Sequence, residues 1–364
     1  MFMEMYIYGA GTVGLQVLEI LKQYYPFQIK SLCGFIDRNK RQPVGGIPII
    51  PIENIKPEAR IVIAIRSRDT ALDVHKELKK RGHLDVWWFT RRWKKYGTDF
   101  WREMCVSCQG WQMPILPQVE MHIMDSCNLN CRGCAHFSPI FENNVPDFSS
   151  RISDVKAFAQ KFGHIFRFAI LGGEPFLNKD IGRYAEKIRE ILPYSTIEII
   201  TNGLLIPGIP DETFEAIRKN NVCISISEYE PTHRIIDNIT TRLEGFGILY
   251  EIRDYSGKKN FNIPLSLKKD SRYEKRCISN GCITIWNGKM ARCPTLMYID
   301  KFNQQFHMNL PNDGVMALDE EIAGEELIQR FSEKVPLCDH CVWHEVEWSV
   351  CGRTTRWEDF AVGD

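Results

Sequence analysis

Short apolar runs alternate with helical segments in two stretches of this 364-residue chain, and this alternation constrains the fold more than any other feature. Such repeats predict parallel sheets, because parallel strands need crossover connections that are usually helical. In the first stretch the predicted strands are residues 5–8, 29–36, 61–65 and 86–89, with a helix over 69–81. In the second stretch the predicted strands are 119–124, 167–171, 196–200, 222–227 and 248–253, and the predicted helices lie near 153–162, 180–192, 211–220 and 232–243. The pattern predicts an α/β protein, and the length predicts two or three domains.

A glycine-rich turn follows the first predicted strand. Gly9, Gly11 and Gly14 form a G-x-G-x-x-G pattern that opens a helix, and Asp37 ends the second strand. This order is the dinucleotide-binding fingerprint, in which the glycines admit a phosphate to the helix N-terminus and the acid binds a ribose diol. Residues 1–92 are therefore predicted to form a small Rossmann-like domain that binds NAD or a nucleotide sugar. The alternative is that the glycines serve only a tight turn.

The same domain carries a second sequence signature. Residues 34–38 (Gly-Phe-Ile-Asp-Arg) and 44–49 (Val-Gly-Gly-Ile-Pro-Ile) resemble the small N-terminal domains of bacterial sugar-modifying proteins. In some of those proteins the pocket takes a nucleotide sugar instead of NAD. The resemblance therefore implies a sugar-related ligand.

Three cysteines follow the strand over residues 119–124. Cys127, Cys131 and Cys134 form a C-x3-C-x2-C triplet on one short loop. Three thiolates can hold three irons of a [4Fe–4S] cluster and leave the fourth iron open for a small molecule, whereas structural clusters usually have a fourth Cys. A zinc site completed by His136 is the alternative.

Two further motifs lie downstream at strand ends. Residues 171–175 read Leu-Gly-Gly-Glu-Pro, and residues 199–203 read Ile-Ile-Thr-Asn-Gly. Together with the cysteine triplet, they make residues 117–255 resemble the radical S-adenosylmethionine (SAM) superfamily. The resemblance implies a partial (β/α)6 barrel over residues 118–260. It also implies a [4Fe–4S] cluster that binds SAM, cleaves it to a 5′-deoxyadenosyl radical, and receives electrons from a flavodoxin or ferredoxin.

The resemblance also implies residues that contact SAM. Gly172 and Gly173 would let the backbone approach the methionine part closely, Glu174 would lie near its amine, and Pro175 would stiffen the turn. The other implied contacts are Thr201, Asn202 and Ser225.

The strand over residues 222–227 carries a candidate catalytic thiol. Cys223, Ser225 and Ser227 share one face because side chains alternate along a strand. If this face looks into the barrel, Cys223 could donate a hydrogen atom to a substrate radical. An ordinary buried thiol is the alternative, because free Cys is among the most buried residue types.

A predicted hairpin brings two C-terminal cysteines together. Asn287-Gly288 is a strong hairpin signal, and it sets Trp286 opposite Lys289. Counting outward, Cys282 lies opposite Cys293, at a separation that suits two corners of a cluster. Cys338 and Cys341 could supply the other two ligands, with Cys277 or Cys351 as competitors.

This region resembles the auxiliary-cluster domains named SPASM or, in shortened form, twitch. Gly288-x4-Cys293 matches their G-x4-C element, and the resemblance implies one auxiliary [4Fe–4S] cluster within residues 261–364. Residues 93–117 are predicted to be a linker, and its Cys105 and Cys108 leave open a second cluster. A structural zinc is the alternative for paired C-x2-C sites.

Charge and hydropathy exclude several classes of function. The 46 basic and 46 acidic residues balance, which gives no electrostatic case for nucleic acid or a membrane surface. No apolar run is long enough to span a bilayer. Thirteen cysteines, clustered at C-x2-C spacings, fit a metal protein in a reducing compartment, and the cytoplasm is expected.

The predicted function is radical abstraction of hydrogen from a sugar or nucleotide sugar, leading to dehydrogenation or epimerisation. One alternative is a radical SAM enzyme of the SPASM type that modifies peptides. Another alternative is a nucleotide-binding redox sensor without turnover. NAD-dependent hydride transfer would need the second half of a dinucleotide-binding fold, which the sequence does not indicate. The candidate general bases are Glu345, Glu347, Arg253 and Tyr255.

Overall fold

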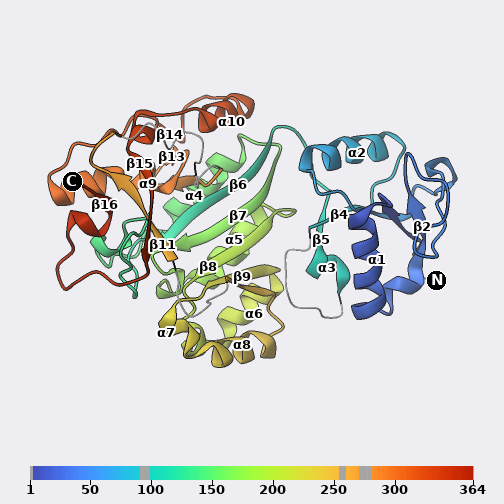
Figure 1. The fold of residues 1–364 in the computed structure, drawn as a ribbon, viewed down its shortest axis with the longest axis horizontal. Coiled ribbons are helices and arrows are strands. Elements are labelled where there is room, and N and C mark those ends of the chain that lie inside the picture. The colour runs from blue at the N-terminus through green and yellow to red at the C-terminus, as the bar shows by residue number, and fades with distance from the viewer. Residues whose placement is uncertain (1–2, 91–98, 254–259, 270–276, 278–280, 364) are drawn as a thin grey trace. The chain divides into compact units, whose positions relative to one another are not determined.

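The computed structural model describes residues 3–90, 99–253, 260–269, 277 and 281–363. The chain divides into two compact units, Met1–Trp111 and Gln112–Asp364. Tyr255, one of the candidate bases, lies outside the described residues. The mixed α/β class that the sequence predicts is confirmed in both units (Figure 1).

The first unit is built around a five-stranded sheet of order β2-β1-β3-β4-β5. The first four strands in the chain are parallel, and β5 runs antiparallel to β4. Its elements are β1 (Met5–Tyr8), α1 (Thr12–Tyr24), β2 (Leu32–Ile36), β3 (Arg60–Ile63), α2 (Arg68–Lys80), β4 (Val86–Phe89), α3 (Phe100–Met104) and β5 (Cys105–Ser107). Fully buried apolar residues such as Ile7, Val17 and Phe35 fill the core between the sheet and the helices.

The predicted linker over residues 93–117 needs correction. Within the described part of it, Asp99 caps α3 by accepting hydrogen bonds from the N–H groups of Trp101 and Arg102, and β5 extends the first sheet. Cys105 and Cys108 are buried in this unit, and burial raises the pKa of both thiols. They therefore behave as core residues of the first unit. A helix and a strand this short have no clear periodicity in the sequence.

The second unit contains, in the described residues, an eight-stranded sheet of order β10-β9-β8-β7-β6-β12-β13-β14. Its first five strands in the chain are parallel, as predicted, and their bounds are β6 (Ile115–Met124), β7 (His164–Gly172), β8 (Thr196–Thr201), β9 (Val222–Ser227) and β10 (Tyr250–Arg253). The connecting helices are α4 (Phe148–Ala159), α5 (Ile181–Ile191), α6 (Asp211–Lys219), α7 (Glu230–His233) and α8 (Ile236–Gly245).

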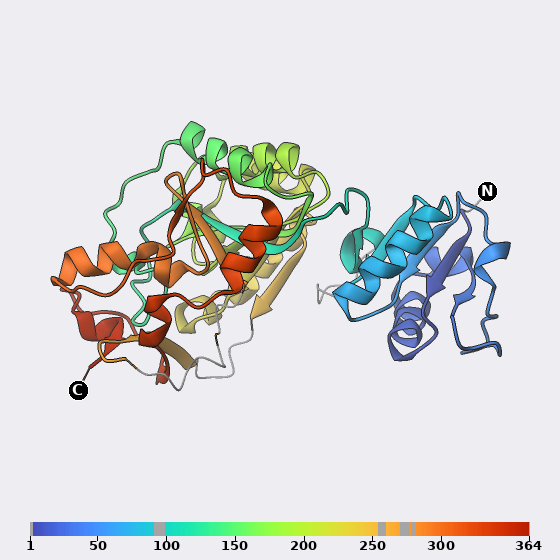
Figure 2. The same cartoon turned by 90° about the horizontal axis from the view of Figure 1, so that it is seen from above.

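These helices lie along one face of the strands, as Figure 2 shows for the green and yellow elements. Helix α5 illustrates the reason. Ile181, Tyr184, Ala185 and Ile188 are buried and recur every three or four residues, so that one stripe of the helix packs on the sheet. Along β6, apolar side chains such as Val119 and Met121 pack in this core, and they alternate with the polar Gln118, Glu120 and His122.

The C-terminal segment is joined to the barrel sheet and does not form a separate domain. Strand β12 (Ile283–Trp286) pairs in parallel with β6, and β13 (Lys289–Ala291) and β14 (Met316–Ala317) continue the sheet. The predicted hairpin is confirmed, with Trp286 opposite Lys289 and a turn in which Asn287 and Gly288 have φ of 49° and 72°. The predicted boundary at residue 260 therefore falls inside one structural unit.

The remaining elements complete this unit. Helices α9 (Pro294–Phe306) and α10 (Gly324–Ser332) follow the hairpin, and a three-stranded sheet has the order β15-β11-β16. Its strands are β11 (Asn260–Ser266), β15 (Cys341–Glu347) and β16 (Ala361–Val362). Short 3-10 helices occupy Gln28–Ser31, Ile52–Asn54, Ser138–Ile140, Pro175–Leu177, Ile206–Gly208, Pro336–His340 and Trp357–Asp359.

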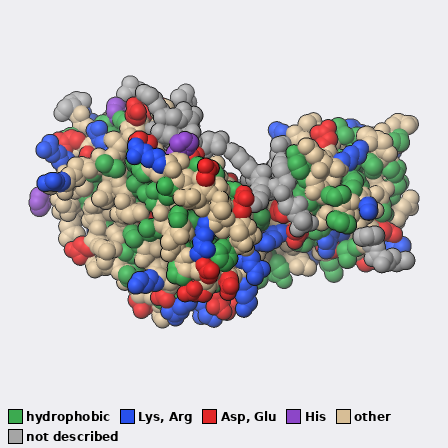
Figure 3. All heavy atoms as spheres, turned by 90° about the horizontal axis from the view of Figure 1, so that it is seen from below, with side chains coloured by type: hydrophobic (Ala, Val, Ile, Leu, Met, Phe, Trp, Pro, Cys, Tyr) green, Lys and Arg blue, Asp and Glu red, His purple; other side chains and the backbone are tan. Residues whose placement is uncertain are grey.

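Two surface properties agree with the composition. Basic and acidic side chains are mixed on the face that Figure 3 displays. Among the described residues, no helix combines the length and the apolar character needed to cross a membrane.

Candidate functional site

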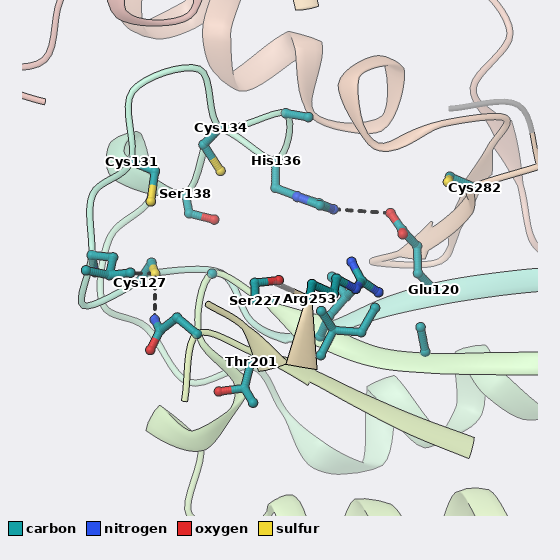
Figure 4. Close-up of a pocket in the computed structure, with 18 of the residues that line it drawn as sticks. Glu120, Cys127, Cys131, Cys134, His136, Ser138, Thr201, Ser227, Arg253 and Cys282 are labelled. Carbon is teal, nitrogen blue, oxygen red and sulfur yellow. Dashed lines mark hydrogen bonds and ion pairs between the residues drawn. The ribbon is translucent and has the colours of Figure 1, made fainter. Parts of the chain in front are cut away.

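A cavity of about 400 Å³ lies at the carboxyl ends of the parallel strands. Cys127, Cys131 and Cys134 line one part of it, and Figure 4 shows their side chains on a single loop. Gly172, Gly173, Thr201 and Asn202 line it from the ends of β7 and β8, and Ser227 and Arg253 from the ends of β9 and β10. Strand ends of a barrel sheet carry the active sites of such folds because the loops that follow them converge there.

The loop with the three cysteines owes its shape to two residues of positive φ. Asn130 has φ of 48° and Gly133 has φ of 76°. Asn tolerates this conformation better than other residues with a side chain, and Gly adopts it freely. A Cβ on Gly133 would lie 3.1 Å from Phe261 and 3.2 Å from the carbonyl oxygen of Asn262, so the loop is also packed tightly against β11.

Nitrogen donors surround the cysteine sulfurs. The backbone N–H of Leu129 donates to Sγ of Cys127 over 3.4 Å, and the amide of Asn202 lies 3.8 Å from the same sulfur. The indole N–H of Trp348 donates to Sγ of Cys131 over 3.1 Å. Donors in these positions suit thiolates, because charge-assisted hydrogen bonds are stronger than neutral ones.

Burial raises the pKa of Cys127 and Cys131 to about 12. Burial also acts on Cys134, but its hydrogen bond with His136 holds the pKa below the ordinary value. Buried thiols of this kind become thiolates when a metal replaces the proton. The loop therefore fits an iron–sulfur cluster, which is held by thiolates.

His136, which would complete a zinc site, has two partners. It hydrogen-bonds with Cys134 and contacts Glu120, with 3.2 Å between Nε2 and Oε1 (Figure 4).

The Gly-Gly-Glu-Pro motif is in close backbone contact with the cysteine loop. A Cβ on Gly172 would overlap the carbonyl group of Met124, and a Cβ on Gly173 would overlap that of Ser126. The backbone N–H of Gly173 donates to Met124 O over 2.8 Å. The sequence analysis predicted that these glycines let SAM approach the backbone. The structure adds a second reason for glycine: a side chain at either position would prevent β7 and the turn after it from packing against Met124 and Ser126.

Glu174 is fully buried and faces β8. One oxygen accepts hydrogen bonds from the Thr201 hydroxyl (2.7 Å) and the Phe176 N–H (3.1 Å), and the other from the Asn202 N–H (2.9 Å). Its carboxylate is thus directed to the strand end, whereas the sequence analysis expected it near the SAM amine. Pro175 begins a short 3-10 helix at the same turn. The Glu174 carboxylate thus holds the Gly-Gly-Glu-Pro motif against Thr201 and Asn202 of the second motif.

The burial of Glu174 gives a pH prediction. Burial raises its pKa from 4.5 to about 7, although the three hydrogen bonds oppose the shift. The folded state therefore retains a proton that the unfolded state loses, and stability falls as pH rises from about 4.5 to about 7. In the metal-free protein, Glu174→Gln should remove about 2 kcal/mol of the change in unfolding free energy between about pH 5 and 8, measured with denaturant.

The exposed Glu142 supplies the control for this measurement. The Glu142→Gln variant should keep the pH dependence of the wild type. If Glu174→Gln keeps it as well, the buried carboxyl is not the titrating group.

Strand β9 positions Ser227, and not Cys223, at the cavity. Ser227 ends the strand and lines the cavity, whereas Cys223, the second residue of the strand, is buried and is not among the lining residues. Ser225 is buried between them and donates to Glu251 over 2.8 Å. Cys223 pairs with Glu198, which pairs in turn with the cavity-lining Ala169. Its assignment as a catalytic thiol stays a prediction.

A polar region of the cavity was missed by the sequence analysis. Glu120, on β6, accepts hydrogen bonds from Thr284 (2.9 Å) and His136. Burial alone would lower the pKa of His136, but its hydrogen bonds with Cys134 and Glu120 raise it to about 10. Arg167, on β7, is paired with Glu198 and donates to Gln118 over 3.0 Å. These residues come from strands far apart in sequence, and no motif marks them.

The C-terminal cysteines lie in two places. Cys282 lines the cavity and accepts a hydrogen bond from Gln118 over 3.3 Å. Burial raises the pKa of Cys293 and of Cys341 to about 12; Cys341 adds to the shift of Cys293, Cys338 adds to that of Cys341, and Cys277 acts on both. Arg292 contacts Cys338. The paired residues of the hairpin end at Thr284 and Ala291, so the predicted pairing of Cys282 with Cys293 stays a prediction.

Cys351 lies beside the loop that carries the triplet. Its N–H donates to Asn130 O over 2.8 Å, and it acts electrostatically on Cys131. Cys351 was named as a competing ligand for the auxiliary cluster, and that part of the ligand set stays a prediction. Among the candidate bases, Arg253 lines the cavity, whereas Glu345 and Glu347 are exposed on β15.

The glycine turn of the first unit has the predicted geometry. Gly9 has φ of 105°, and a Cβ on Gly14 would overlap the carbonyl group of Gly9. A Cβ on Gly11 would meet nothing within 4 Å. Two of the glycines are therefore required by the turn itself, and only Gly11 borders open space at the start of α1.

Asp37 is bound to this turn. One of its oxygens accepts the N–H of Ala10 (2.8 Å), and the other accepts the N–H groups of Asn39 and Lys40 (2.9 Å each). Burial alone would raise the pKa of Asp37, but these backbone donors hold it below its ordinary value. The carboxylate thus stabilises the turn, a role that the sequence analysis did not assign.

The radical SAM superfamily model matches residues 121–255. This range holds the three cysteines and both downstream motifs, so the chain is a radical SAM superfamily protein through its central region. The predicted family is confirmed, and with it the cofactors that define the family, a [4Fe–4S] cluster and SAM.

Relatives of known activity match the same part of the chain. The GTP 3′,8-cyclase of Alkaliphilus oremlandii is 30% identical over 115 residues, which are 31% of this chain and 35% of the cyclase. That of Staphylococcus carnosus is 23% identical over 155 residues, which are 41% of this chain and 44% of the cyclase. The chain thus spans less than half the length of these relatives.

Solved structures give weaker likenesses. BtrN in complex with AdoMet and 2-DOIA is 14% identical, covers 67% of this chain and 98% of its own, and has a TM-score of 0.39. The anSMEcpe protein with bound AdoMet and Cp18Cys peptide is 19% identical, covers 37% of this chain and 42% of its own, and has a TM-score of 0.30. Likenesses this weak do not indicate a substrate.

Proposed function

We propose that this protein is a radical SAM enzyme that abstracts hydrogen from a carbon of a sugar or nucleotide sugar, leading to dehydrogenation or epimerisation. One observation carries the proposal. The cavity that begins at Cys127, Cys131 and Cys134 ends among polar side chains that include Glu120 and Arg167. A substrate there would have SAM on one side and hydrogen-bonding groups on the other.

Each residue at the cysteine end would have a binding role. Cys127, Cys131 and Cys134 would hold three irons, and the backbone of Gly172 and Gly173 would border SAM. Bound there, the cluster and SAM supply a 5′-deoxyadenosyl radical, and an external flavodoxin or ferredoxin would supply the electron. Thr201 and Asn202, which also line the cavity, would orient SAM.

The other end of the cavity would recognise hydroxyl groups. Glu120 accepts hydrogen bonds, whereas Gln118 and Arg167 donate them. The cavity wall therefore offers both an acceptor and donors to a sugar hydroxyl, which can donate and accept. Hydrogen bonds to charged groups are stronger than neutral ones, which would make these contacts selective. An apolar substrate would leave the same groups unpaired, at a cost of about 1–3 kcal/mol each.

An auxiliary [4Fe–4S] cluster would use Cys293, Cys338 and Cys341, with Cys277 or Cys282 as the fourth ligand. A cluster near the substrate can accept an electron, which favours dehydrogenation. If Cys282 remains a free thiol in the cavity, it could return a hydrogen atom to the substrate, which favours epimerisation. Because it lines the cavity, Cys282 is a second candidate for this role beside Cys223.

The peptide alternative has less support. A peptide backbone also needs donors and acceptors, but a peptide substrate would have no use for the nucleotide-binding role that we propose for the first unit. A redox sensor without turnover has no need for the Gly-Gly-Glu-Pro motif.

The test is anaerobic reconstitution with iron and sulfide, followed by reduction in the presence of SAM and a panel of deuterated nucleotide sugars. Deuterium should appear in 5′-deoxyadenosine with one class of substrate. Deuterium transfer from a peptide panel alone would replace the sugar proposal by the peptide alternative. Zinc instead of iron, or intact SAM under strong reductant, would overturn the radical proposal.

We further propose that the first unit binds a nucleotide or nucleotide sugar at the glycine turn. The open space at Gly11 supports this, because no packing in the turn explains a glycine there. Gly11→Ala should leave the melting temperature unchanged and weaken binding of UDP-glucose or NAD at least about tenfold, measured by calorimetry, since a methyl group would occupy the phosphate position. Equal binding by wild type and variant would contradict the proposal.

A further inference from the structure

The chain segment after β15 lies along the loop that carries the three cysteines. Cys131 and Val350 form an antiparallel bridge. The N–H of Arg132 donates to Ser349 O over 2.9 Å, and the N–H of Cys351 donates to Asn130 O over 2.8 Å. The cysteine loop is thus paired, residue by residue, with a segment more than 200 positions downstream.

Trp348 is the residue of this segment that reaches a cysteine sulfur. Its indole N–H donates to Sγ of Cys131 over 3.1 Å. Its ring packs against Tyr229, with 5.2 Å between the ring centroids and an interplanar angle of 36°. Tyr229 itself lines the cavity. The indole is therefore held between the cavity wall and the cysteine loop, with its N–H directed to the sulfur.

We infer that Trp348 is a positioning residue that raises the reduction potential of the cluster on the cysteine loop. This inference rests on the proposed function, in which Cys131 is a ligand. Reduction adds a negative charge that spreads onto the cysteine sulfurs. A donor at one of these sulfurs stabilises the reduced form more than the oxidised form, and such hydrogen bonds are a recognised determinant of cluster potentials.

The contact also has a functional consequence. Every turnover begins with transfer of one electron to the cluster, so its potential decides which donor can drive the reaction. Trp348 contacts the cysteine loop from the C-terminal segment, whereas the glycine motif contacts it from the turn after β7. Electron uptake would therefore depend on the docking of the C-terminal segment.

The experiment compares wild type with Trp348→Phe, which keeps an aromatic ring against Tyr229 but lacks the N–H. Both reconstituted full-length proteins are titrated with reductant, and the cluster whose EPR signal changes when SAM is added is followed. Trp348→Phe should lower the equilibrium constant for its reduction about threefold to tenfold, which is about 28 to 59 mV for a one-electron couple. The matched control is Trp343→Phe, at a 53% exposed tryptophan of the same strand region, and it should leave the potential unchanged.

The outcomes separate this inference from the proposed function. An unchanged potential in Trp348→Phe, with the SAM-sensitive signal intact, overturns the inference and leaves the function standing. Loss of the cluster in Trp348→Phe also overturns it, because the indole would then only hold the loop. Absence of a SAM-sensitive signal from the wild type would mean that the proposed function itself has failed.

Discussion

Replacing Cys127, Cys131 and Cys134 together by alanine is expected to lower the iron content of the reconstituted protein from about eight to about four per chain and to abolish formation of 5′-deoxyadenosine. The three sulfurs line one end of the cavity from a single loop. Alanine cannot bind iron, so the cluster that binds SAM should be lost, whereas the proposed auxiliary cluster would keep its ligands. Iron and sulfide analysis and chromatography of the reaction products measure the two effects.

A control with other cysteines removed makes this result specific. Cys33 is exposed, and Cys223 is buried near the start of β9 and is not among the residues that line the cavity. A Cys33→Ala/Cys223→Ala variant should keep its irons and cleave SAM at a rate close to that of the wild type. If the triple variant retained all of its iron, the loop would not be a cluster site.

The second large effect is expected from Gly173→Ala, a change of one methyl group. The added Cβ would overlap the carbonyl group of Ser126 and approach the backbone nitrogen of Cys127 to 2.7 Å. Both are backbone atoms and cannot move aside as a flexible side chain would. Overpacking of this kind costs about 1–3 kcal/mol, occasionally more. Because the displaced residues lead directly into the first cluster ligand, we expect the variant to lose most of its SAM-binding cluster as well.

Unfolding in denaturant and iron analysis of the same preparation measure both effects of Gly173→Ala. Gly208→Ala is the matched control, because a Cβ there would meet nothing within 4 Å. It should have the stability and iron content of the wild type. A Gly173→Ala protein that matched this control in both measurements would show that the close backbone contact is not required.

The sequence predicted the repeating part of the fold well. Strand β9 and the strands at Met5–Tyr8 and Val86–Phe89 have the predicted bounds, because apolar runs between polar turns mark a buried parallel strand. The last predicted helix is split into α7 and α8. Thr232, at the split, donates its hydroxyl proton to Asn202 O over 2.6 Å. That tertiary hydrogen bond has no counterpart in a helical periodicity.

The candidate site divides in the same way. The cysteine loop and the glycine motif are local in sequence; spacing marked the loop, and the resemblance to the radical SAM superfamily marked the motif. The polar end of the cavity was not, because Thr284 and Glu120 meet only through the pairing of β12 with β6. The placement of Cys351 was missed for a similar reason, since spacing grouped it with Cys341 whereas backbone pairing joins it to Asn130.

The pairing of β12 with β6 has a consequence for how this chain is made. Strand β6 lies between β7 and β12 in the sheet, but β12 begins at Ile283, long after β6 has left the ribosome. Until then the edge of β6 exposes unpaired N–H and C=O groups, which can pair with another nascent chain. A truncated chain that ends before residue 283 should therefore aggregate, even though it contains every residue of the matched superfamily region.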